Sequence, residues 1–165
     1  MAVKPPHILR ASSNVRKMRS NLEGTVDRKA LSAIDRAILD NVKSLLSLGK
    51  EHYDFACAQG PGTWRQCVSR LYYGAYNASR AVRLYRDGRY STDAADHKEV
   101  GKLPDDFPDR ERYSNELDTL REDRNLCDYD HTAVGGDLAR DVAAWRELVG
   151  EFIERVGEYI KEGVD

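Results

Sequence analysis

Four long segments of this chain carry an apolar or small residue at every third or fourth position, and this spacing limits the folds open to the chain more than any other feature. In the first segment, residues 27–58, the stripe consists of Ile34, Ile38, Val42, Leu45, Gly49, His52 and Ala56. An α-helix with 3.6 residues per turn places residues at such spacing on one face. No segment alternates apolar and polar residues convincingly, so the sequence predicts an all-α fold.

The second and fourth segments, residues 63–87 and 137–161, repeat this pattern. Their stripes are Trp64, Val68, Leu71, Ala75, Ala78, Val82 and Tyr85, and then Leu138, Val142, Trp145, Val149, Phe152, Val156 and Tyr159. Thr63 and Gln66 have the spacing of a capping box, in which each side chain bonds a free backbone N–H at the start of a helix. With the third segment described below, these helices and their short connections predict an up-and-down bundle of four main helices.

Two regions lie outside the four helices. Residues 89–108 are expected to form a polar loop with a short helical turn near His97. Residues 1–26 are expected to form a basic tail or a loosely docked short helix, which leaves the bundle domain to residues 27–165. We favour a solvated tail over an arm that contacts RNA. The charged residues of this region are Lys4, Arg10, Arg16, Lys17, Arg19 and Glu23.

Composition limits which partners, cellular compartment and metal sites are expected for this protein. The 165 residues have a formal net charge of −2, so a nucleic-acid partner would have to bind a local basic patch. The sequence lacks a membrane-spanning apolar run and the apolar centre of a signal peptide, which predicts a cytoplasmic protein without a membrane partner. Cys57, Cys67 and Cys127 lack metal-ligand spacing and are expected to be small buried residues, with no metal and no cofactor.

In the third segment, residues 109–129 or 109–131, the stripe changes from apolar to ionisable residues halfway along. The stripe reads Tyr113, Leu117, Leu120, Arg124, Cys127 and His131. On a continuous helix, Arg124 and His131 would share one face, about 10 Å apart along the axis. An unpaired buried guanidinium costs several kcal/mol, so this part of the stripe is expected to line a cleft or to meet a partner chain. The alternative is an arginine paired with Asp128, Asp130 or Glu122, and a histidine at a fraying helix end.

The sequence from Arg124 to His131, RNLCDYDH, resembles the signature of HEPN (higher eukaryotes and prokaryotes nucleotide-binding) domains. That signature is an arginine, usually followed by a polar residue such as asparagine, and then a histidine after four to six residues. Residues 69–81, SRLYYGAYNASRA, are similar to the small-and-aromatic segment of one large HEPN branch. The pairs at 97–98 (His-Lys) and 128–129 (Asp-Tyr) also resemble that branch. The resemblance covers roughly residues 33–160.

This resemblance implies a HEPN-like helical bundle and a metal-independent endoribonuclease, for instance a toxin or defence effector. It also implies a homodimer in which two copies of the Arg124/His131 helix meet. The alternative is a catalytically inactive HEPN module that binds a nucleotidyltransferase or another protein partner, and a third possibility is a scaffold subunit of a defence complex. In some pairs of a HEPN module and a nucleotidyltransferase, a tyrosine two residues after the histidine is modified, but this chain has Ala133 at that position.

For an enzyme, the substrate would be RNA, whose own 2′-hydroxyl can attack the phosphorus. His131 would be the general base or acid, Arg124 would stabilise the phosphate, and Asn125 would orient either group. The expected products are a 2′,3′-cyclic phosphate and a 5′-hydroxyl.

Other side chains have two interpretations each. Arg80 and Arg83 could hold a phosphate backbone, but a solvated helix face with acid pairs is at least as good an explanation. Tyr129 could stack on a base, although we favour packing. His97 is expected to be a loop or packing residue, and Tyr72, Tyr73 and Tyr76 are expected in the core; these residues are not assigned to the catalytic site.

Overall fold

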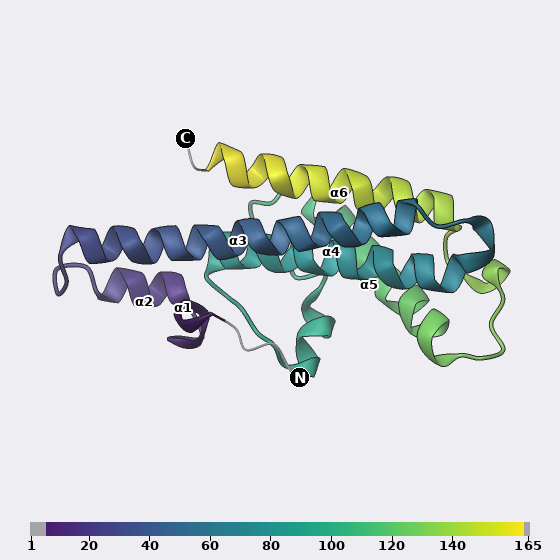
Figure 1. Cartoon of the computed structure of the whole chain (residues 1–165), viewed down its shortest axis with the longest axis horizontal. Coiled ribbons are helices and arrows are strands. Elements are labelled where there is room, and N and C mark those ends of the chain that lie inside the picture. Colours follow the sequence, from purple (N-terminus) through teal and green to yellow (C-terminus); the bar gives the residue numbers. More distant parts are fainter. Residues whose placement is uncertain (1–5, 164–165) are drawn as a thin grey trace.

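The computed structural model describes residues 6–163, and these residues form an all-α bundle without a β-strand (Figure 1). The α-helices within them are α1 (His7–Arg10), α2 (Val15–Asn21), α3 (Arg28–Cys57), α4 (Trp64–Asp87), α5 (Arg110–Tyr129) and α6 (Val142–Glu162). Short 3₁₀ helices lie between them: η1 (Pro61–Thr63), η2 (Ala94–Glu99) and η3 (Gly135–Asp137). The predicted all-α class and the predicted helical turn near His97 are confirmed.

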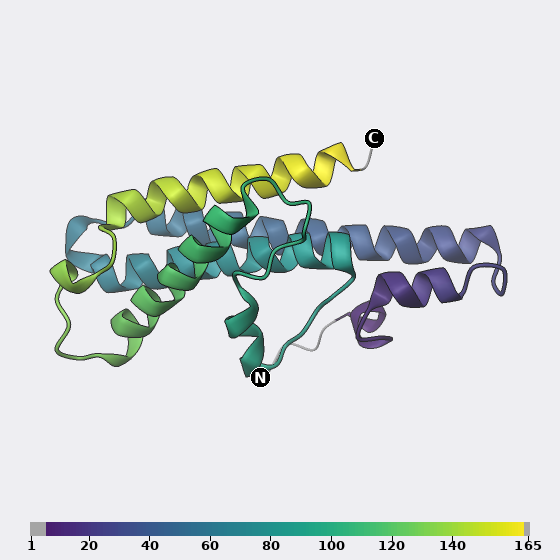
Figure 2. The ribbon, with the colours of Figure 1, turned by 180° about the vertical axis from the view of Figure 1, so that it is seen from behind.

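Helix α4 lies at the centre of the bundle, in contact with α3, α5 and α6. Its buried residues are on nearly every side, from Cys67 to Leu84. The long antiparallel pair of α3 and α4 is visible in Figure 1, and Figure 2 shows α5 crossing the bundle obliquely.

The N-terminal region packs on α3 over residues 7–21. Leu9 and Val15 are buried, and the backbone N–H of Val15 donates to the carbonyl of Gly88 at 2.9 Å. The docked short helix is therefore the better description of this region than a solvated tail. Lys4, one of the basic residues of the expected tail, lies outside the described residues.

Helix α4 begins where expected, at Trp64 after Thr63, but the predicted capping box and the expected start of the last helix are wrong. The Thr63 hydroxyl donates to the carbonyl of Gly60 at 2.8 Å and caps no N–H, so the capping box does not form. Helix α6 begins at Val142 and not near residue 137, because the Asp141 carboxylate accepts from the N–H of Ala144 at 2.7 Å. A side-chain acceptor at this position fixes a helix N-terminus.

The cysteines divide into two groups. Cys67 and Cys127 are buried as expected, and burial raises the pKa of the Cys127 thiol to about 12. Cys57 is exposed, so the expectation that all three are buried is wrong. Cys57 is the last residue of α3, where the helix has passed the edge of the core. Within residues 6–163, no helix is long and apolar enough to cross a membrane.

A pair of glycines sets the spacing between α3 and α4. A Cβ added at Gly49 would lie 2.8 Å from the carbonyl oxygen of Gly74 and 3.3 Å from the N of Ala78. These neighbours are backbone atoms of the central helix, so they cannot rotate away. The two helix backbones therefore touch where residue 49 has no side chain.

We expect Gly49→Ala to lower the free energy of unfolding by about 1–3 kcal/mol, because the new methyl group forces α3 and α4 apart. The matched control is Gly157→Ala on α6, where the nearest atom to an added Cβ is Leu46 Cδ2 at 3.9 Å. The control should be neutral or gain about 0.5–1 kcal/mol from helix propensity. Urea unfolding followed by circular dichroism measures both, and equal stabilities would contradict the close contact.

Candidate functional site

Arg124 is held by polar groups from its own helix and from α4. Its Nη2 donates to the Tyr73 hydroxyl at 3.0 Å, and its Nη1 donates to Asn125 Oδ1 at 3.2 Å. Its Nε lies 2.8 Å from Oδ2 of Asp128, one helical turn further along α5. The side chain is 14% exposed. The paired-arginine alternative, with Asp128 as the partner, is thus the arrangement observed.

Three tyrosine rings surround the guanidinium of Arg124. The Arg124 Cζ lies 5.6 Å from the ring centroids of both Tyr72 and Tyr73, and 5.4 Å from that of Tyr129. Each ring face attracts a cation at this distance. Burial alone would lower the pKa of Arg124, but the Tyr73 hydroxyl and Asp128 raise it overall, so the group stays charged.

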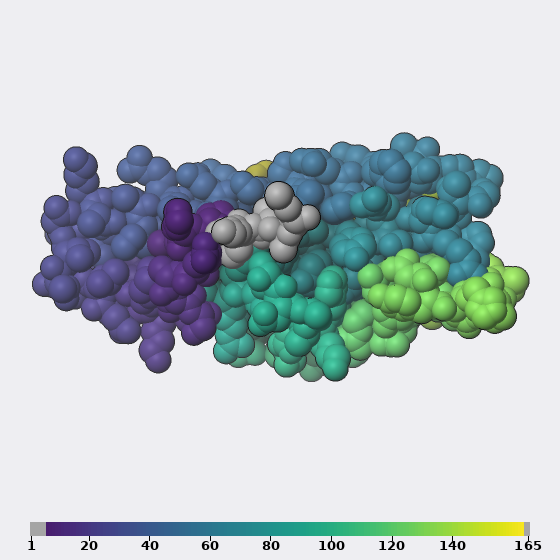
Figure 3. Space-filling view, turned by 60° about the horizontal axis from the view of Figure 1, so that its bottom comes forward, coloured from purple at the N-terminus to yellow at the C-terminus, as the bar shows by residue number. Residues whose placement is uncertain are grey.

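A cleft of about 510 Å³ opens beside Arg124, between α5 and the loop that contains η2. Figure 3 shows the teal surface of this loop and the green surface that follows α5 next to each other on one face. The cleft has three permanently charged cations and one carboxylate. Its lining residues are Tyr72, Ala94, His97, Lys98, Arg121, Glu122, Arg124 and Asn125.

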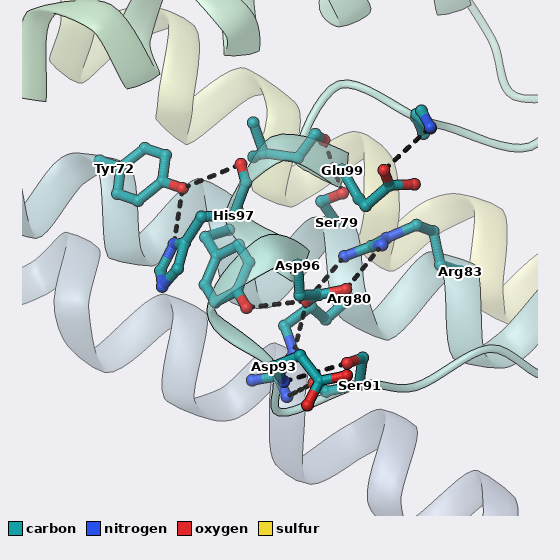
Figure 4. Close-up of polar contacts among 12 residues, drawn as sticks. Tyr72, Ser79, Arg80, Arg83, Ser91, Asp93, Asp96, His97 and Glu99 are labelled. Carbon is teal, nitrogen blue, oxygen red and sulfur yellow. Dashed lines mark hydrogen bonds and ion pairs between the residues drawn. The ribbon is translucent and has the colours of Figure 1, made fainter. Parts of the chain in front are cut away.

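His97 enters this cleft from η2 in a fixed orientation (Figure 4). Its Nδ1 lies 2.8 Å from the Tyr72 hydroxyl, and its ring stacks on Tyr76 with the centroids 4.4 Å apart. Burial lowers the pKa of His97, and the positive charge of Arg124 lowers it further. His97 is therefore neutral near pH 7.

Asp96, the residue before His97, anchors the loop to α4. Its carboxylate is buried, accepts from the Tyr76 hydroxyl at 2.7 Å, and accepts from both Nη atoms of Arg83 at 3.2 and 3.3 Å (Figure 4). Arg80 Nε lies 3.5 Å from the same carboxylate. A buried carboxylate is tolerated because these partners compensate its charge.

The arginines proposed to hold a phosphate backbone thus have another role. The Arg83 side chain is 9% exposed and that of Arg80 is 13% exposed, and both face Asp96. Their guanidinium groups are not offered to a strand of RNA on the surface. The alternative of internal acid pairs describes both residues.

His131 does not lie on the helical face of Arg124, because α5 ends at Tyr129. Asp130 is extended, and its carboxylate accepts from the N–H of Thr132 at 2.8 Å. Arg65 of α4 donates to the carbonyls of Cys127 and Asp130 at 2.8 and 2.7 Å. The expected two-turn separation on one helix is therefore wrong. His131 is exposed in the turn that follows and is not among the residues that line the Arg124 cleft.

Tyr129 also differs from expectation. It is 74% exposed, so the interpretation as a packing residue is wrong, and only its ring beside Arg124 is in contact with the site. Its place in the last turn of α5 gives it no neighbour on the outer side of the bundle. A large exposed aromatic ring beside a guanidinium is suited to contact a base or a protein partner.

Sequence reasoning missed the part of the site that does not come from α5. Tyr72 is buried in the core and His97 packs in the loop, as expected, but both also line the cleft, and Tyr73, at the edge of the core, binds Arg124. The signals in the sequence were the resemblances of residues 69–81 and of the pair at 97–98 to one HEPN branch. Periodicity could not find these contacts, since they join positions 25 or more residues apart.

Among residues 6–163, no group of three or more histidine, cysteine, aspartate or glutamate side chains is arranged to hold a metal ion. Comparison of the chain with models of protein families, with curated proteins and with solved structures gives no match.

We expect Asp96→Ala to cost about 3–5 kcal/mol of unfolding free energy, because it leaves Arg83 charged and buried without a partner. Asp105→Ala is the matched control, since its carboxylate is 97% exposed and pairs only with Arg110 on the surface. The control should change stability little. Chemical denaturation of both variants is the measurement, and a similar small loss for both would refute the anchoring role of Asp96.

Proposed function

We propose that this protein is a metal-independent endoribonuclease of the HEPN type, acting as a toxin or defence effector, in which Arg124 binds the scissile phosphate of RNA. The observation that carries the proposal is the placement of the Arg124 guanidinium, fixed by three tyrosine rings at the edge of a cleft rich in cations. The resemblance of residues 124–131 to the HEPN signature supports the same reaction.

The hydrogen bonds of Arg124 indicate which of its donors is available to a phosphate. Nε faces Asp128 at 2.8 Å and Nη2 bonds Tyr73 at 3.0 Å, whereas Nη1 has only longer bonds, to Asn125 at 3.2 Å and Tyr129 at 3.5 Å. A phosphate oxygen accepts a stronger, charge-assisted bond than either of these neutral groups. Nη1 is therefore the donor that we assign to the phosphate, with Asn125 beside it.

The reaction needs no group beyond the RNA and the side chains. The 2′-oxygen attacks the phosphorus and forms the cyclic phosphate, while the bond from phosphorus to the 5′-oxygen breaks. A histidine takes the proton of the 2′-hydroxyl, and the departing 5′-oxygen gains a proton. Arg124 stabilises the negative charge that builds on the phosphate oxygens. The sequence signature assigns the proton transfer to His131.

We expect the wild type to cleave a mixed RNA substrate in EDTA, and Arg124→Ala to lose about 10²–10³ of the rate, the usual cost of one charge-stabilising donor. His131→Ala is assayed beside it. Arg112→Ala is the matched control, because Arg112 lies on the same helix and pairs with Glu151 away from the cleft. Cleavage that EDTA abolishes, or full activity of Arg124→Ala, would argue against the proposal.

The second candidate is a module that binds a protein partner, either a second copy of this chain or a nucleotidyltransferase. One observation favours it: Tyr129, the last residue of α5, is 74% exposed, and Val134, directly before η3, is 61% exposed, so two large apolar side chains are in contact with solvent in this part of the chain. Exposed apolar groups of this kind mark interaction surfaces when they gather. Because active HEPN domains pair through this helix, the two candidates are compatible.

We expect the protein to sediment as a homodimer and Val134→Asp to shift it toward the monomer, since the substitution would bury a carboxylate in the interface. Leu48→Asp is the control, because Leu48 is 41% exposed on α3 and belongs neither to α5 nor to the turn after it. Sedimentation equilibrium measures the shift. A wild type that stays monomeric at all concentrations excludes the homodimer and leaves the other partner.

A further inference from the structure

Two histidines compete for the proton transfer that RNA cleavage requires, and only one lies in the Arg124 cleft. His97 lines the cleft together with Arg124, although the two come from η2 and α5. His131, which the sequence signature assigns, is exposed in the turn beyond the end of α5. A catalytic base must come within hydrogen-bond reach of the proton it takes, so position in the cleft favours His97.

The Tyr72 hydroxyl can serve both protonation states of His97. It lies 2.8 Å from Nδ1 and 3.4 Å from the carbonyl oxygen of the same residue (Figure 4). When Nδ1 has no proton, the hydroxyl donates to it. When Nδ1 carries a proton, Nδ1–H donates to the hydroxyl oxygen, and the hydroxyl proton turns toward the carbonyl. The ring can therefore gain and lose a proton without losing this contact.

The opposite edge of the ring is left for a ligand. Nε2 has no hydrogen-bond partner among residues 6–163, and in Figure 4 it points away from Tyr72. Stacking on Tyr76 and the anchoring of the preceding residue, Asp96, hold the ring in place. A half-buried imidazole with one nitrogen fixed and the other free is arranged as an acid–base group.

We propose that His97 is a catalytic acid–base residue of the Arg124 cleft, an inference that rests on the proposed ribonuclease function. Nε2 of neutral His97 takes the proton of the 2′-hydroxyl as the 2′-oxygen forms its bond to phosphorus. The 5′-oxygen leaves with the electron pair of the broken bond and takes a proton from water. The resulting hydroxide and the imidazolium neutralise each other, which returns His97 to its starting state.

The charges around His97 suit a base, because cations outnumber carboxylates. The charged and titratable groups that face it are Arg121, Glu122 and Arg124 on α5, Tyr72, Tyr73, Tyr76 and Arg80 on α4, and Asp96 and Lys98 beside it on η2. Burial and Arg124 lower the pKa of His97, while Asp96 opposes them. The neutral form able to accept a proton is therefore the dominant one near pH 7. Binding of a phosphate next to Arg124 adds a negative charge, which favours the imidazolium that the reaction forms.

The test compares two histidine variants in the full chain, with cleavage of an oligoribonucleotide measured in EDTA. We expect His97→Gln to lose about 10²–10⁴ of the wild-type rate and the acid limb of the pH–rate profile. Binding of the 2′-deoxy analogue should stay within about threefold, because no binding donor to the phosphate is removed. His52→Gln is the matched control: His52 is half-buried and packs beside Tyr73 outside the cleft.

The outcomes separate the two proposals. No cleavage by the wild type overturns the ribonuclease function and this inference with it. Cleavage by the wild type that His97→Gln retains overturns the inference alone. Loss in His97→Gln and also in His131→Ala supports the inference and gives the second proton transfer to His131.

A second measurement does not depend on how the variant folds. In the wild-type chain, NMR titration with uridine 3′-monophosphate should move the midpoint of the His97 titration to higher pH and leave that of His52 in place. An unmoved His97 midpoint at saturating nucleotide would overturn the inference.

Discussion

A single buried carboxylate ties the site to the bundle. Asp96 lies in the short 3₁₀ helix η2, and its oxygens accept from Tyr76 and Arg83 of the central helix. Its burial is tolerable only with these partners, so the loop has one favoured position on α4. His97 is the next residue, so the contacts of Asp96 also fix its place. The same contacts hold the wall of the cleft that lies opposite α5.

The other wall of the cleft depends on aromatic rings. Tyr72 and Tyr73 leave α4 in different directions, the first toward His97 and the second toward Arg124, and both rings lie against the guanidinium. Adjacent residues on a helix point about 100° apart, so two neighbouring side chains can contact two different groups. Arg124 thus stays charged in contact with these rings, the Tyr73 hydroxyl and the Asp128 carboxylate, while its Nη1 makes only long hydrogen bonds. Such an arrangement suits a ligand that arrives and departs.

Periodicity along the chain was enough to predict the helices but not their ends. Residues 28–57 and 64–87 match the expected segments closely, because a long apolar stripe has only one helical interpretation. The two wrong helix ends, near residue 137 and at His131, share a cause, because in each case one hydrogen-bonded side chain decides where the helix begins or ends. For the site, Arg124 and Asn125 follow from the sequence, whereas Tyr73 and His97 join it through contacts across the fold. No local pattern records those contacts.

Arg65 shows that a side chain distant in the sequence can decide where a helix ends. Its guanidinium binds the carbonyls of Cys127 and Asp130, which a further turn of α5 would have used as acceptors, and also that of Ala133. The length of α5 is therefore a property of α4, some 60 residues earlier in the chain. In a homologous chain with a short side chain at position 65, no guanidinium would bind these carbonyls, and α5 could continue through the same motif. Two sequences identical from 124 to 131 can then present their arginine and histidine in different relative orientations.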